Sequence, residues 1–251
     1  YIADPVLGFR LKQGFQIKPT NAFRILMLGD SFTQGNEVAK TFSQLLEEKL
    51  NSQANQSYTV INAGVRGGSP LQYYLWLKNE GLKLKPDFIV LNFYLGNDIT
   101  DAFMFNIASD SAGLATKLTL KDTYVDERGY LRRRQTHFSL CELSAFCRLY
   151  LRSQPKASNW DSQAWQTTQA HLLAINQLAQ DQLILTLIPE ADNFDTPLRQ
   201  LLIDFANDNN IKLVDFTPRL DRSMYDTFDR HWNQTGHQLA ADMLYEYFLS
   251  L

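Results

Sequence analysis

Cysteine is scarce in this sequence, and long apolar runs are missing. Its only two cysteines, Cys141 and Cys147, are too few for a disulfide framework, and their spacing fits no metal-binding motif. We expect both to be small buried hydrophobic residues, with a single disulfide as the alternative. No run reaches the roughly 18 apolar residues that a membrane-spanning helix requires, because Asn92 interrupts the longest candidate, 88–95. The sequence therefore predicts no membrane span.

A surplus of positive charge is also missing. The net charge is −3, and we interpret the clearest basic cluster, three arginines at 132–134, as a solvated charge run. This balance predicts no nucleic-acid partner. With 45% apolar and 20% charged residues, the 251-residue chain has the composition of an ordinary globular protein, and we expect one domain spanning 1–251.

Five short apolar runs recur along the chain, with helical patterns between them. Runs of this kind, nearly continuous in Val, Ile and Leu, are typical of strands buried on both faces of a parallel sheet. They lie at 24–28, 58–62, 87–93, 182–188 and 211–216. The alternation of such strands with helices predicts a doubly wound α/β fold.

Three helix starts are marked by their capping residues. Thr41 with Gln44 forms a capping-box pattern ahead of an apolar stripe at 42–50. Ser69 precedes Pro70, the favoured first-turn residue, and Asn233 is positioned to cap the last helix. The region from about 101 to 155 shows only one clear helical piece, 144–151, and we expect an insertion or lid there.

The chemistry of doubly wound folds lies beyond the carboxyl ends of the strands. Here the segments 29–31, 64–68 and 96–98 follow the first three predicted strands and are small or polar. Ser31 stands at the first of these ends. A serine between a strand and a helix commonly caps the helix, so the tripeptide leaves open whether Ser31 is a cap or a nucleophile.

A nucleophilic serine needs a base, and the chain has only four histidines. His171 follows the stripe of a helix and is most simply a boundary residue, while His137 falls in the insertion and suits a surface or lid role. His237 lies inside the last helix. His231 comes before that helix in a loop and is the candidate base.

An acidic group that orients this base is expected nearby. Asp229, two residues before His231, can bring its carboxylate to Nδ1, and Asp226 is a rival. The alternative is that these are exposed loop residues ahead of a helix cap. A metal site formed with His237 is disfavoured, because the six-residue gap between the histidines does not place both on one helix face.

Donors for a developing oxyanion are available in two loops. Gly67 lets its backbone N–H approach a ligand, and the Asn97 amide is a neutral donor. The alternative for Gly67 is a tight turn after the second strand. The glycines do not form G-x-G-x-x-G, and the G-x-S-x-G elbow fails because Thr33 takes the place of its second glycine.

Four segments in one order resemble the SGNH hydrolases, also called the GDSL-like esterase and lipase superfamily. They are 29–32 (GDSF), 62–67 (NAGVRG), 96–98 (GND) and 229–233 (DRHWN). The resemblance implies a three-layer α/β/α, flavodoxin-like fold with a central five-stranded parallel sheet. It also implies that no metal or organic cofactor is required.

The resemblance assigns a role to each matching position. Ser31 would be the nucleophile, His231 the base and Asp229 the orienting acid. The backbone N–H groups of Ser31 and Gly67 and the side chain of Asn97 would form the oxyanion hole. One departure is the spacing Asp-x-His, since many members have Asp-x-x-His, which would put Phe228 in the place of the acid.

The implied function is a serine esterase that hydrolyses an O-acyl ester, with O-acetyl and a carbohydrate as the expected acyl group and carrier. An O-acyltransferase, a lipase, a thioesterase or an idle glycan- or partner-binding domain would retain the same residues. The opening 1–21, with DPVLGFRLKQG, looks like the lead-in of bacterial SGNH proteins outside the cytoplasm. Because the chain begins at Tyr1, we expect a trimmed chain or a mature form. The expected partner is a small-molecule or glycan ester.

Overall fold

The fold is built on a parallel sheet of five strands. A computed structural model describes residues 2–3, 10–11, 22–35, 38–53, 57–102, 105–120, 123–125, 131–133 and 162–251. The strand order is β11-β10-β5-β3-β4, and every neighbouring pair is parallel. The strands confirm the five apolar runs: β3 (Ala22–Gly29), β4 (Ser57–Gly64), β5 (Phe88–Tyr94), β10 (Leu183–Ile188) and β11 (Lys212–Asp215).

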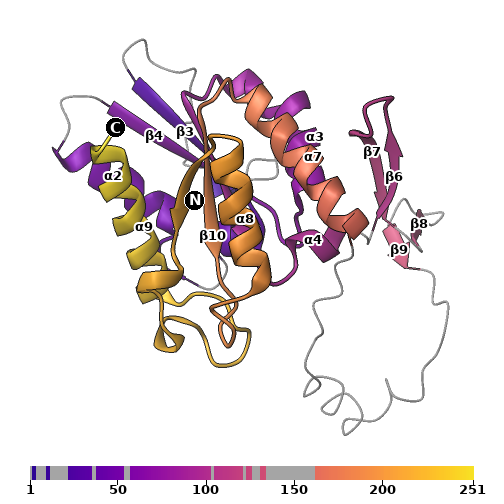
Figure 1. Cartoon of the computed structure of the whole chain (residues 1–251). Helices are drawn as coiled ribbons and strands as arrows, with labels where there is room; N and C mark the ends of the chain where they lie inside the picture. The colour runs from indigo at the N-terminus through magenta and orange to yellow at the C-terminus, as the bar shows by residue number, and fades with distance from the viewer. Residues whose placement is uncertain are drawn as a thin grey trace, which may run out of the picture.

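Helices cover both faces of this sheet (Figure 1). Successive residues of β3 show the division, because Leu26 and Leu28 belong to one apolar core while Ile25 and Met27 belong to the other. The first core is closed by α3 (Pro70–Asn79), α7 (Ser162–Leu178) and α8 (Pro197–Asp208). The second is closed by α2 (Phe42–Gln53) and α9 (Gln234–Leu249). The predicted three-layer α/β/α fold is confirmed.

The capping residues act largely as predicted. Thr41 and Gln44 form a reciprocal capping box, with Gln44 Oε1 2.8 Å from the Thr41 backbone nitrogen. Asn233 caps α9 by accepting from two backbone N–H groups of the first turn. Pro70 begins α3, but the Ser69 hydroxyl contacts the Gln72 side chain at 3.1 Å instead of a backbone N–H.

The sheet has one topological switch point. The chain passes from β3 to its neighbour β4 and then to β5 on the opposite side of β3, so the loops after β3 and β5 diverge. Two short helices begin there, α1 (Ser31–Gln34) and α4 (Asp98–Asp101). Gly29 ends β3 with a φ of 157°, and a Cβ at this position would collide with the side chain of Thr33. Only glycine therefore permits this turn into α1.

The predicted insertion begins with an antiparallel hairpin of β6 (Phe105–Ser109) and β7 (Ala115–Leu120). Two further short pairs join β8 (Thr123–Val125) to β9 (Leu131–Arg133) and β1 (Ile2–Ala3) to β2 (Arg10–Leu11). The expected helical piece at 144–151, His137 and both cysteines lie outside the described residues.

The expectation of a boundary position for His171 is wrong. This residue is fully buried, and it contacts both the ring of Tyr74 in α3 and the first residue of β7. Its Nδ1 donates to the carbonyl of Thr167 at 2.7 Å, and its Nε2 accepts from the backbone N–H of Ala115 at 3.0 Å. Burial lowers the pKa of His171, which suits a neutral ring with one donor and one acceptor.

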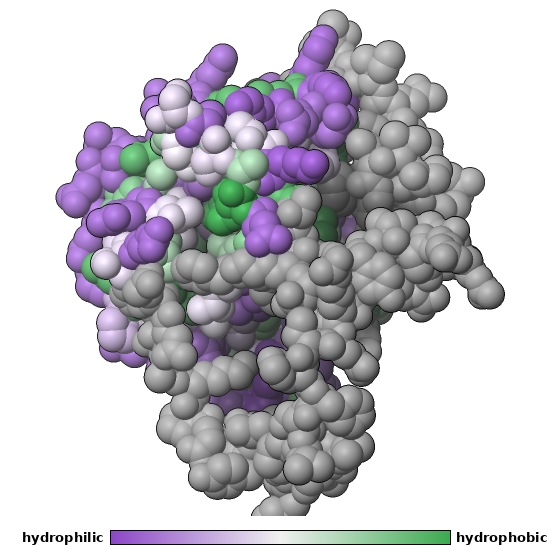
Figure 2. All heavy atoms as spheres, turned by 90° about the vertical axis from the view of Figure 1, so that its right-hand side faces the viewer, coloured by the Kyte–Doolittle hydropathy of each residue, from purple (hydrophilic) through white to green (hydrophobic). Residues whose placement is uncertain are grey.

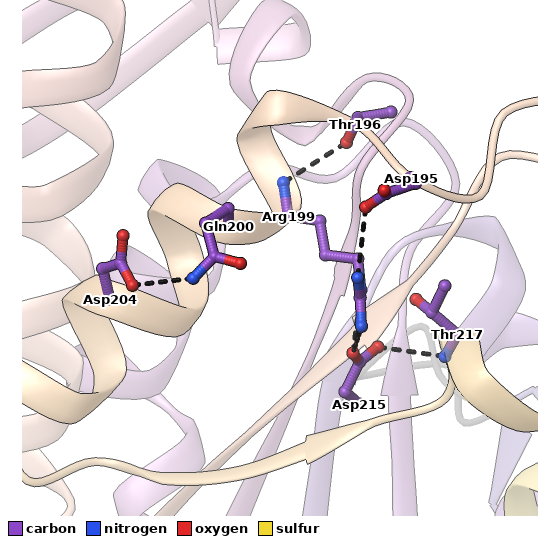
Figure 3. Close-up of polar contacts among 7 residues, drawn as sticks. All are labelled: Asp195, Thr196, Arg199, Gln200, Asp204, Asp215 and Thr217. Atoms are coloured by element: carbon purple, nitrogen blue, oxygen red, sulfur yellow. Dashed lines mark hydrogen bonds and ion pairs between the residues drawn. The ribbon is translucent and has the colours of Figure 1, made fainter.

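A polar network ties α8 to the edge strand β11 (Figure 3). Arg199 donates to Asp215 through two nitrogens, at 2.8 and 2.6 Å, and also pairs with Asp195 at 3.2 Å. The second oxygen of Asp215 accepts from the backbone N–H of Thr217 at 2.9 Å, where a short 3-10 helix begins. The described 3-10 helices are η1 (Gly81–Leu84), η3 (Thr217–Arg219) and η4 (Arg222–Met224).

The face that carries the hairpin is largely hydrophilic where it is described, with small apolar patches between polar residues (Figure 2). Among the described residues, no helix combines the length and apolar character needed to cross a membrane.

Candidate active site

Ser31 is the first residue of α1, and the cap of this helix is its neighbour Asp30. The Asp30 carboxylate accepts from the backbone N–H of Phe32 at 2.9 Å. The alternative in which Ser31 caps the helix is therefore wrong, and its hydroxyl is available for another partner. Its contact with Asp30 is long, at 3.4 Å.

That partner is His231, whose Nε2 lies 2.7 Å from the Ser31 Oγ. The imidazole sits in the loop ahead of α9 and packs against the ring of Phe32, with the ring centroids 4.9 Å apart. The next residue, Trp232, is buried and contacts the same phenylalanine at 5.4 Å. Phe32 thus supports both the imidazole and the residue that anchors its loop.

The two rival carboxylates take different positions around His231. Asp229 Oδ2 lies 3.2 Å from Nδ1, and its Oδ1 accepts from the His231 backbone N–H at 3.0 Å. Asp229 Oδ2 and His231 Nδ1 are close but not aligned for a hydrogen bond, so Nδ1 has no hydrogen-bond partner among the described residues. Asp226 instead accepts from the backbone N–H groups of Phe228 and Asp229, and these bonds lower its pKa.

Backbone geometry and ion pairs fix this loop. Arg230 adopts a left-handed φ of 66°, which turns the chain back so that the residues on either side of it meet. Its guanidinium pairs with Asp192, which also pairs with Arg222 at 3.0 Å. The Asp226 backbone N–H donates to the His231 carbonyl at 2.7 Å. These contacts explain how a carboxylate two residues before the histidine, that of Asp229, comes close to the imidazole.

Gly67 and Asn97 follow the two strands that flank β3. Gly67 has a left-handed φ of 68°, and no described residue accepts from its backbone N–H. Asn97 precedes α4 without capping it, and its Oδ1 is buried with no hydrogen-bond partner among the described residues. Gly67 therefore leaves a backbone donor unused by the fold, as an anion-binding loop would require, whereas the unpartnered atom of Asn97 is an acceptor.

Two buried carboxyl groups lie at this edge of the sheet. Burial raises the pKa of Asp30 to about 7. Burial also raises the pKa of Asp98 well above its ordinary value, and Asp98 Oδ2 accepts from the Tyr73 hydroxyl at 3.5 Å. Burial thus disfavours the charged form of the Asp98 carboxyl. Within the described ranges, no cluster of His, Cys, Asp and Glu could hold a metal ion.

This geometry can be compared with known proteins. The model of the family described as GDSL-like Lipase/Acylhydrolase matches residues 25–244, which is most of the chain. The chain belongs to this family. The resemblance found in the sequence is confirmed, and this GDSL-like protein is a hydrolase of the esterase and acylhydrolase class. No curated protein matches the chain.

Solved structures share the fold at low identity. A two-domain esterase active on acetylated mannans is 18% identical, with a TM-score of 0.56, over 91% of this chain and 49% of its own. This chain thus spans about half of that protein. A lipase/acylhydrolase from Enterococcus faecalis is 15% identical, with a TM-score of 0.54, over 91% and 96%. An acetyl xylan esterase is 16% identical, with a TM-score of 0.53, over 90% and 99%.

The roles of several residues around the site were not predicted from the sequence. The roles of Phe32, Asp30 and Arg230 depend on tertiary contacts, and only the positions of Phe32 and Asp30 beside Ser31 offered a signal. Asp192 lies far from the other loop residues in the sequence, and nothing there marks it as their anchor.

Proposed function

We propose that this GDSL-like hydrolase is a serine esterase that works through an acyl-enzyme on Ser31. The observation that carries the proposal is the 2.7 Å contact between the Ser31 Oγ and the His231 Nε2. A hydroxyl within hydrogen-bond reach of an imidazole, itself beside a carboxylate, is the arrangement that activates a serine. Asp229, at 3.2 Å from Nδ1, is the orienting acid in this proposal.

Each half of the reaction uses the same proton carrier. The Ser31 oxygen attacks the ester carbonyl carbon while His231 takes the hydroxyl proton. The backbone N–H groups of Ser31 and Gly67 and the Asn97 amide stabilise the oxyanion. His231 then protonates the departing alcohol and leaves the acyl group on Ser31. In the second half, His231 takes a proton from water, the resulting hydroxide attacks the acyl carbon, and Ser31 recovers its proton as the acid leaves.

The proposed substrate is an O-acetyl ester carried by a glycan. Two of the similar folds carry the names of esterases for acetylated mannans and acetyl xylan, which supports this substrate class. A comparison of 4-nitrophenyl acetate with the octanoate tests the acyl group. Faster turnover of the acetate is expected, and a preference for the octanoate would favour a lipase or thioesterase instead.

The nucleophile is tested with a fluorophosphonate, which traps activated serines, followed by intact-mass measurement. We expect one adduct on the wild type and none on Ser31→Ala or His231→Ala. Ser223→Ala is the matched control, because Ser223 is an exposed serine of η4 whose hydroxyl bonds to Asp221 and to no other described residue. It should keep the adduct. A folded wild type that forms no adduct, or an adduct that persists in Ser31→Ala, would overturn the proposal.

A further inference from the structure

Phe228 is the most exposed large apolar side chain among the described residues. Its side chain is 94% exposed, and it lies next to Asp229 in the loop that carries His231. A single exposed apolar residue on a protein surface needs no explanation. The position of Phe228, three residues before the proposed base, is what distinguishes it from the exposed leucines at the C-terminus.

The backbone that carries Phe228 is fixed. Its N–H donates to Asp226 Oδ1 at 2.7 Å, and the same oxygen accepts from the Asp229 N–H at 3.3 Å. The ion pairs of Arg230 and Arg222 with Asp192 hold the other side of the turn. The ring is thus presented to solvent from an ordered turn, and a ligand that contacts it would order little additional backbone.

A second exposed apolar side chain lies on the loop of a proposed oxyanion donor. Val65 is 45% exposed, two residues before Gly67, and its backbone is held by a bond from its N–H to the Gly29 carbonyl at 2.9 Å. Two loops that carry proposed site residues therefore each present an apolar group to solvent.

The surroundings of Phe228 favour one kind of ligand. Its neighbours Asp226, Thr227, Asp229 and Arg230 are all exposed and polar. A fatty acyl chain would need a continuous apolar groove, whereas a sugar ring offers one C–H face for an aromatic ring and hydroxyl groups for polar neighbours. Three residues of chain span at most about 11 Å, so the contact falls on a sugar close to the acylated one.

We infer that Phe228 is a specificity-determining residue that stacks against a sugar ring of the glycan carrying the ester. The inference rests on the proposed function. Because the contact lies away from the reacting bond, it stabilises the ground state and the transition state alike. Its loss should therefore raise KM for a glycan and leave kcat nearly constant.

The test compares 4-nitrophenyl acetate with O-acetylated oligosaccharides from xylan and mannan. Phe228→Ala should raise KM about tenfold for the oligosaccharides, so that the ratio of kcat/KM between oligosaccharide and small ester falls about tenfold. Phe228→Trp, which keeps an aromatic face, should stay within about twofold of the wild type. Leu251→Ala is the control, because it removes an exposed apolar side chain at the end of the chain beyond α9.

Each other outcome overturns the inference. If Phe228→Ala leaves the ratio of kcat/KM between oligosaccharide and small ester unchanged, Phe228 does not contact the glycan. This holds whether or not the variant loses activity equally on both substrates. A wild type that cleaves 4-nitrophenyl acetate but no acetylated oligosaccharide would overturn the stacking role and leave the serine esterase standing. A wild type without any fluorophosphonate adduct would instead overturn the proposed function itself.

Discussion

The Ser31 Oγ and the His231 Nε2 lie 2.7 Å apart although 200 residues separate them in the chain. The turn from β3 into α1 fixes the serine, and the loop between η4 and α9 fixes the histidine. Neither segment could hold this geometry alone, because Phe32 of one packs against Trp232 of the other. The contact is therefore a product of the complete fold.

Asp229→Asn should lower the catalytic rate much more than Asp226→Asn. Asp229→Asn keeps an acceptor for the His231 backbone N–H but removes the charge at Nδ1, so kcat for 4-nitrophenyl acetate should fall about 10²- to 10⁴-fold. Asp226→Asn keeps an acceptor for the turn and should cost less than about tenfold. The measurement is steady-state kinetics on both variants, and an equal or larger loss in Asp226→Asn would contradict the assignment of Asp229.

Asn97→Ala should separate activity from stability. The amide is proposed as an oxyanion donor, so its removal should lower kcat about 10²- to 10³-fold. The same change deletes a buried Oδ1 with no described partner, so the free energy of unfolding in urea should stay constant or increase. Asn209→Ala is the matched control: it removes a side-chain bond to the Phe205 carbonyl at the end of α8 and should retain full activity. Parallel losses of activity and stability in Asn97→Ala would make Asn97 a structural residue.

The sheet and the positions of its loops could be predicted from the sequence because buried parallel strands leave an unmistakable pattern. Runs such as 24–28 and 182–188 are apolar on both faces, and the polar segments after them fall at one edge by topology alone. The capping box of Thr41 and Gln44 could be predicted as well, because it depends only on local spacing.

Features set by tertiary contacts could not be predicted in this way. The hydrogen bond to His171 Nε2 comes from a hairpin residue 56 positions away in the chain, in a region that the sequence suggested only as an irregular insertion. The choice between Asp226 and Asp229 depends on the left-handed turn at Arg230, a residue type that gives no sign of this conformation. Spacing alone allowed either acid to approach the imidazole.

The free energy of unfolding of Asp30→Asn, relative to that of the wild type, should increase as the pH rises. The folded-state pKa of Asp30, about 7, exceeds its ordinary value of 3.8, so the wild type loses stability as the pH rises from about 4 to about 7. Asparagine still caps α1 but does not ionise. The difference in the free energy of unfolding between variant and wild type should therefore grow by about 2 kcal/mol from pH of about 5.5 to about 8.5, since one pKa unit is worth about 1.4 kcal/mol.

Urea unfolding at the two pH values measures this difference. Asn207→Gln, near the exposed end of α8, changes no titratable group, so it is the control and should show a difference that does not change with pH. A difference for Asp30→Asn that also stays constant would mean that the Asp30 carboxyl has an ordinary pKa in the folded protein.

His237 should make the protein less stable in mild acid. Burial lowers its pKa to about 4, and its Nδ1 accepts from the backbone N–H of Phe42 at 3.1 Å, a bond that protonation would break. Below pH of about 6.5 the unfolded chain binds a proton that the folded protein does not, so stability falls until the pH reaches about 4. The loss attributable to this one group is roughly 3 kcal/mol over that range.

His237→Asn isolates this contribution, because the asparagine oxygen can take the place of Nδ1 as the acceptor for Phe42 but does not titrate. The variant loses the ring contacts with Phe42 and Trp232, at 5.7 and 5.9 Å, so it should be less stable than the wild type at neutral pH. Its stability should nevertheless fall less steeply with acid, and the gap between the two proteins in urea unfolding should narrow by about 2 kcal/mol from pH of about 7.5 to about 5. Parallel curves would show that the pKa of His237 is the same in the folded and unfolded protein and that the α2–α9 contact does not depend on its neutral form.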